Sequence, residues 1–137
     1  VIKKLLASFF LLGTFKHQRY DKGQTSPQGK QAEEIAANYL LEKNYQLIDK
    51  NYRRGRSEVD IIAKKANFII FVEVKSLKNK NGIHPEQQVT KEKINLIHSA
   101  ANVYQYENNW RGNVQFDIIA ITFFTKHFEI EHFKDAF

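Results

Sequence analysis

The chain has 137 residues, of which 42% are hydrophobic and 26% charged, proportions typical of one folded domain rather than a disordered chain. It contains no cysteine, which excludes disulfides, thiol catalysis and cysteine-based zinc sites. A formal net charge of +6 favours an anionic partner, either nucleic acid or an anionic membrane surface.

The chain begins with "VIKKLLASFFLLGTF", in which two lysines precede a hydrophobic run from Leu5 to Leu12. That run is shorter than the roughly 20 residues of a membrane-spanning helix, and no A-x-A-like cleavage site follows it. Three interpretations compete: a helix packed on the domain, a weak membrane anchor, and an extension foreign to the fold. We favour the first and third, and therefore expect a cytoplasmic protein without a membrane partner. Residues 1–25 are assigned to an N-terminal extension and residues 26–137 to the domain.

Helix and strand signals then alternate along the chain. Ser26 is a natural N-cap with Pro27 in the first helical position, and apolar residues follow at helical spacing until about Asn44. A second helix is expected after Thr90. Runs rich in β-branched and aromatic residues predict strands over 45–53, 57–64, 68–75, 114–124 and 126–133. The order α-β-β-β-α-β-β predicts an α/β domain with a mixed central β-sheet flanked by helices.

The second and third strands, "SEVDIIAK" and "FIIFVEVK", carry acids within apolar runs. If they form a hairpin that turns at Ala66–Asn67, Asp60 lies opposite Glu73 on one face of the sheet. Lys75, two residues beyond Glu73, then points to the same face. "FIIFVEV" is expected to be buried on both faces, where an unpaired charge is costly.

Two adjacent carboxylates repel each other unless a cation lies between them. Asp60 and Glu73 therefore form a candidate site for Mg²⁺ or Mn²⁺, with Lys75 placed to orient or deprotonate an attacking water. Glu33 flanks the buried stripe of the first helix and could reach the same site. This arrangement suits phosphodiester hydrolysis, although a solvated face with acids neutralised by Lys75 is the simpler alternative.

The stretch "GKQAEEIAANYLLEKNYQLIDKNYRRGRSEVDIIAKKANFIIFVEVKS", with "GIHPEQQVTKEKINLIHSAANVY" and "QFDIIAI" further on, resembles the YraN-like family of small bacterial proteins. The resemblance covers about residues 28–121. It implies a restriction-endonuclease-like core with the PD-(D/E)xK signature, related to Holliday-junction resolvases. By that resemblance Asp60 and Glu73 bind the metal, Lys75 is the catalytic lysine, and Glu33 matches a catalytic acid of the first helix.

The resemblance also makes Lys93 a candidate phosphate contact and Asp117 a structural residue. Gln115 stands where the family usually has Arg, and no role is carried over to it.

Basic residues gather in the sequence on both sides of the hairpin. "RRGR" places Arg53, Arg54 and Arg56 before the strand of Asp60, and Lys78 and Lys80 follow the strand of Lys75. Such a rim is what binding to a phosphodiester backbone requires, although ordinary solvated turn charges would look the same. We therefore predict a Mg²⁺- or Mn²⁺-dependent DNA endonuclease, with branched DNA as a candidate substrate and a homodimer as a candidate assembly. A non-catalytic nucleic-acid-binding module on the same fold is the alternative.

Overall fold

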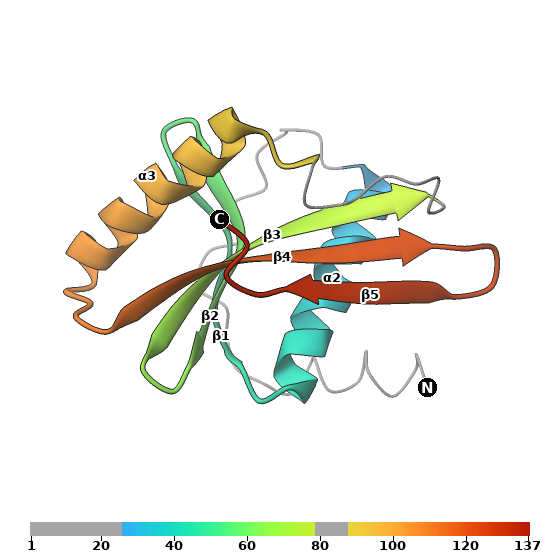
Figure 1. Ribbon diagram of the computed structural model, residues 1–137, viewed down its shortest axis with the longest axis horizontal. Coiled ribbons are helices and arrows are strands. Elements are labelled where there is room, and N and C mark those ends of the chain that lie inside the picture. Colours follow the sequence, from blue (N-terminus) through green and yellow to red (C-terminus); the bar gives the residue numbers. More distant parts are fainter. Residues whose placement is uncertain (1–25, 79–87) are drawn as a thin grey trace.

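A computed structural model of the chain describes residues 26–78 and 88–137. Residues 1–25 and Lys80 lie outside the described residues, so the predictions made for them are not addressed. The described elements are α2 (Pro27–Glu42), β1 (Gln46–Arg54), β2 (Ser57–Lys65), β3 (Phe68–Lys78), α3 (Lys91–Glu107), β4 (Asn113–Phe123) and β5 (Phe128–Phe133). The predicted order and the α/β class are confirmed (Figure 1).

The five strands form one mixed sheet in the order β1-β2-β3-β4-β5. Neighbouring strands are antiparallel except β3 and β4, which are parallel and connected through α3. A parallel pair needs such a crossover, because its two strands start at the same edge of the sheet. The mixed sheet thus follows from the single helix inserted between the third and fourth strands.

The two helices pack on opposite faces of the sheet (Figure 1). Ile70 and Val72 of β3 belong to the core beneath α2, whereas Ile69 and Phe71 belong to the core beneath α3. Alternate side chains of a strand point to opposite faces, so the middle of β3 is covered on both. The prediction that this apolar strand is buried on both faces is confirmed.

Both helices begin at the predicted caps. The Ser26 hydroxyl accepts a hydrogen bond from Gly29 N at 3.1 Å, and the Thr90 hydroxyl accepts one from Lys93 N at 3.2 Å. Asn44 follows α2 with a φ of 63°, the left-handed conformation expected there. Neither helix of the described ranges is long and apolar enough to cross a membrane.

Candidate active site

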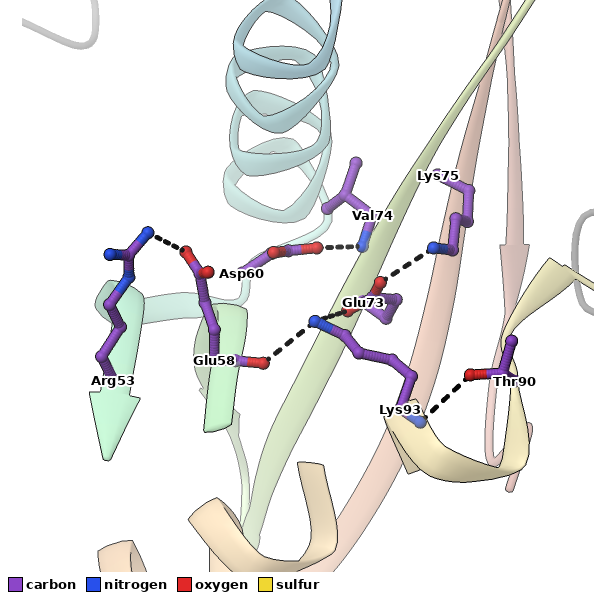
Figure 2. Close-up of polar contacts among 8 residues, drawn as sticks. All are labelled: Arg53, Glu58, Asp60, Glu73, Val74, Lys75, Thr90 and Lys93. Atoms are coloured by element: carbon purple, nitrogen blue, oxygen red, sulfur yellow. Dashed lines mark hydrogen bonds and ion pairs between the residues drawn. The ribbon is translucent and has the colours of Figure 1, made fainter. Parts of the chain in front are cut away.

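The site forms where β2 and β3 separate. The predicted register is confirmed, because the β2–β3 ladder runs from Lys65 opposite Phe68 to Ile61 opposite Val72. It stops one pair before Asp60 and Glu73, which were expected to face each other as a ladder pair and do not. Instead, the Asp60 carboxylate accepts a hydrogen bond of 2.7 Å from the main-chain N–H of Val74 (Figure 2). A side chain thus satisfies a donor that the ladder would otherwise have used.

Side chains do not alternate strictly along β2 around Asp60. Val59 and Ile61 are two residues apart, yet Val59 packs in the core beneath α3 and Ile61 in the core beneath α2. On β1, Asn51 lies between the partners of these two residues and has a φ of 53°, a conformation that reverses the direction of side chains. Asp60 therefore lies between two residues of β2 that pack on opposite faces of the sheet.

Glu73 is 4% exposed and is neutralised from two sides. Lys75 Nζ lies 3.1 Å from Oε1, and Lys93 Nζ lies 3.1 Å from Oε2. Lys93 Nζ also donates to the main-chain oxygen of Glu58 at 3.2 Å (Figure 2). The predicted approach of Lys75 to Glu73 is present, and the structure adds a second ammonium from α3.

Three groups of the site have shifted pKa values. Burial raises the pKa of Asp60 well above its ordinary value, and the negative charge of Glu73 raises it further against the opposing effects of the Val74 N–H and Lys93. Asp60 is partly accessible at the surface, but the protein atoms around its carboxyl group remove most of its hydration. Burial lowers the pKa of Lys93, but the negative charges of Glu73 and Asp60 raise it by more, so the pKa of Lys93 lies above its ordinary value.

Glu33 approaches the same site from α2. Burial raises its pKa, the charges of Glu58 and Glu73 act in the same direction, and a hydrogen bond with the Asn51 side chain opposes them. The negative charge of Glu33, like that of Glu73, raises the pKa of Asp60. Charged side chains from both helices, Glu33 of α2 and Lys93 of α3, thus influence the Asp60 carboxylate. The catalytic role predicted for Glu33 stays a prediction.

The predicted basic residues do not all lie together. Arg53 forms an ion pair of 3.1 Å with Glu58 next to the site, whereas Arg54 forms one of 2.6 Å with Glu107 in the last turn of α3. Glu107 follows Lys93 by 14 residues, about 21 Å along a helix. Arg56 and Lys78 are exposed, with Lys78 at the end of β3.

The structure adds to the site one contact and one residue that the sequence did not predict. Lys93 was expected to contact phosphate, but its bond to the buried Glu73 was not foreseen. Asn51 was missed altogether, although an Asn within a strand is unusual and tolerates the left-handed conformation. Both depend on contacts between distant elements, which local patterns do not encode.

Asp117, expected to be structural, is 0% exposed. Its carboxylate accepts hydrogen bonds from Gln115 Nε2 at 2.8 Å and from the Asp135 main-chain N–H at 3.0 Å. Its other oxygen lies 2.7 Å from Nε2 of His132, whose side chain is 5% exposed. These contacts attach β5 and the residues after it to β4.

The described residues contain no cluster of three or more His, Cys, Asp or Glu side chains that could hold a metal. The donor set of Asp60 and Glu73 still fits Mg²⁺, which commonly takes one or two carboxylates with water and substrate phosphate. The buried oxygen Oε2 of Glu73 accepts no hydrogen bond of regular geometry from the described residues. Its close contact is the ammonium of Lys93, at 3.1 Å. A cation therefore already occupies the neighbourhood of that oxygen.

Fold and site together define a small α/β protein in which two acids and two lysines meet where two strands separate. The model of "Uncharacterised protein family UPF0102" matches residues 32–121, and the chain belongs to this family.

Relatives and one solved structure show similarity over most of the chain. A UPF0102 protein of Flavobacterium psychrophilum is 38% identical over 80% of this chain and 92% of its own length. One of Lawsonia intracellularis is 34% identical over 80% of this chain and 83% of its own length. Among solved structures, Pyrococcus furiosus SfsA in complex with Ca²⁺ matches with a TM-score of 0.35 and 16% identity. That match covers 78% of this chain and 62% of SfsA.

Proposed function

We propose that the chain is a divalent-cation-dependent nuclease of the PD-(D/E)xK type that hydrolyses phosphodiester bonds in DNA. The observation that carries this proposal is the meeting of Asp60, Glu73 and Lys75 at the separation of β2 and β3. The two acids supply hard oxygen ligands, and the lysine supplies a proton-bearing group at the same point. The formal charge of +6 is consistent with a polyanionic substrate.

In this mechanism Asp60 and Glu73 hold Mg²⁺ or Mn²⁺. The cation, when bound, supplies Lewis acidity toward the scissile phosphate and its attacking water. Lys75 would orient that water through Nζ and, as the neutral amine, would accept the proton that the water loses. Glu33 supports the site from the side of α2, and Arg56 and Lys78 contact the nucleic-acid backbone without reading its sequence.

The test is a cleavage assay with purified protein, Mg²⁺ or Mn²⁺, and branched, flapped, single-stranded and duplex DNA. We expect cleavage of at least one substrate, abolished by EDTA and by Lys75→Ala or Asp60→Ala. Lys91→Ala, an exposed lysine on α3, is the matched control and should retain activity. Cleavage that persists in both site variants would contradict the roles given to these residues.

A second candidate function is a nucleic-acid-binding module without catalysis. It is favoured by the double neutralisation of Glu73, since two ammonium groups beside one carboxylate leave no charge that requires a metal. This function predicts DNA binding that weakens with salt, is insensitive to EDTA and is never followed by cleavage.

A further inference from the structure

Lys93 is an ammonium placed among acids, within reach of solvent. Its side chain is 28% exposed, whereas the Glu73 side chain that it contacts is 5% exposed. Its two close contacts are Glu73 Oε2 at 3.1 Å and the Glu58 main-chain oxygen at 3.2 Å. An incoming anion could therefore reach Lys93 without first displacing Glu73 from its buried position.

Lys93 lies at the end of α3 where a positive charge is unfavourable, so the nearby acids are needed to stabilise its ammonium. Lys93 lies in the first turn, and its own main-chain N–H is bound by the capping hydroxyl of Thr90. The positive end of the helix dipole disfavours a cation in this turn and favours an anion such as phosphate. The attraction of the Glu73 carboxylate, 3.1 Å from the ammonium, opposes this effect.

The same ammonium competes with a divalent cation. A metal bound by Asp60 and Glu73 would use carboxylate oxygens of the pair, and Lys93 Nζ is already next to Glu73 Oε2. Two cations cannot share one buried oxygen without strong repulsion. Binding of a metal to Oε2 therefore requires Lys93 to move from that oxygen toward another negative group.

We propose that Lys93 is an exchangeable counter-ion of Glu73, transferred to a nucleic-acid phosphate when substrate binds, so that cation and nucleic acid bind cooperatively. The inference rests on the proposed function for its substrate class. Without nucleic acid, Lys93 occupies the cation's neighbourhood and weakens its binding. With nucleic acid, the phosphate attracts the Lys93 ammonium to the rim and leaves Glu73 Oε2 free for the metal, while Lys75 stays beside Oε1.

The test is isothermal titration of Ca²⁺ into the full chain, with and without duplex DNA, for wild type, Lys93→Met and Lys91→Met. Lys91 is exposed, precedes Lys93 by two residues in the same turn, and provides a control for the loss of one charge. Without DNA, Lys93→Met should bind Ca²⁺ about fivefold or more tightly than wild type, the lower range of measured couplings between sites. DNA should tighten Ca²⁺ binding more in wild type and Lys91→Met than in Lys93→Met.

The outcomes separate this inference from the proposed function. Unchanged or weaker Ca²⁺ binding by folded Lys93→Met without DNA would overturn the counter-ion role, even if wild type cleaves DNA. Equal tightening of Ca²⁺ binding by DNA in wild type and Lys93→Met would overturn the transfer of Lys93 to phosphate.

The proposed function fails separately. Absence of cleavage and DNA binding, with the Ca²⁺ difference present, would reject the proposed function but retain Lys93 as the counter-ion of Glu73. Absence of Ca²⁺ binding in every variant would overturn both. Circular dichroism establishes that each variant is folded.

Discussion

The Asp60 side chain accepts a main-chain hydrogen bond that a neighbouring strand would otherwise accept. Its hydrogen bond to the Val74 N–H satisfies a main-chain donor next to the point where the β2–β3 ladder stops. The same group is desolvated and lies near Glu73, so its charged form is disfavoured although its hydrogen bond favours that form. A residue with these opposing demands is poorly suited to stabilising the fold, but well suited to binding a cation.

Asp60→Asn should therefore stabilise the chain in the absence of divalent cations. The folded-state pKa of Asp60 is raised above its ordinary value, so its contribution to stability is fully present below that ordinary value and is lost as pH rises through the folded pKa. An amide oxygen can still accept from Val74 without carrying the charge. We expect the melting temperature of Asp60→Asn in EDTA to exceed that of wild type by a few degrees at about pH 7.

The measurement is thermal unfolding of both proteins between about pH 4 and about pH 8. The advantage of Asp60→Asn should grow with rising pH and vanish at the acid end, where Asp60 is protonated in both states. A variant less stable than wild type at neutral pH would show that the charged carboxylate is favourable in the fold.

At the scale of elements, the arrangement of β2 and β3 could be predicted in part. The connection at Ala66–Asn67 and the apolar runs on either side of it give the register, and Ala66 has the φ of 51° that a tight turn needs. The point where the ladder stops could not be predicted. Near that point lie the left-handed Asn51 on β1 and the Lys93 side chain of α3, which donates to the Glu58 oxygen, and local sequence patterns encode neither contact.

The buried Asp117 carboxylate attaches β5 to β4, and this attachment can be tested by mutation. Asp117→Ala removes the acceptor of Gln115 Nε2 and of the Asp135 N–H and leaves His132 without its carboxylate. We expect a loss of about 3 kcal/mol in the free energy of unfolding, because buried polar groups lose their partner. Urea unfolding followed by the fluorescence of the single Trp110 measures it.

Glu34→Ala provides the control, since Glu34 is exposed on α2. Its free energy of unfolding should stay within about 0.5 kcal/mol of wild type. A similarly small change in Asp117→Ala would contradict a structural role for the buried carboxylate.

The β1–β2 hairpin supplies a third test, of nucleic-acid binding. Arg56 is exposed, whereas Arg54 is joined to Glu107 in the last turn of α3 by a contact of 2.6 Å. Arg56→Ala should weaken DNA binding and reduce the slope of log K against log salt by about 1, the effect of one lost phosphate contact. Arg54→Ala should change the slope less, because its charge is directed to an acid.

Fluorescence anisotropy of labelled DNA in EDTA, over a series of salt concentrations, compares the two variants. Equal slopes in wild type and Arg56→Ala would remove Arg56 from the contact surface. A larger effect of Arg54→Ala would show that its ion pair opens on binding.

For the whole molecule, a cation site at the separation of two central strands should affect global unfolding. The strands β2 and β3 belong to both hydrophobic cores, one beneath each helix. Anything that binds the folded chain but not the unfolded chain stabilises it, by about 2.7 kcal/mol at a concentration of 100 times the dissociation constant. Mg²⁺ or Ca²⁺ should accordingly raise the melting temperature of wild type, whereas K⁺ at equal ionic strength controls for screening of the +6 charge.

Asp60→Asn should be more stable than wild type without a divalent cation and less stable than wild type with one. In EDTA it is expected to be more stable than wild type, because it lacks a desolvated charge beside Glu73. In saturating Mg²⁺ wild type should gain stability and the variant should gain little, because an amide is a weaker ligand than a carboxylate for a hard cation. Scanning calorimetry with and without Mg²⁺ records both effects. Equal gains in the two proteins would place cation binding elsewhere than at Asp60, whereas no gain in either would favour a site neutralised by Lys75 and Lys93 alone.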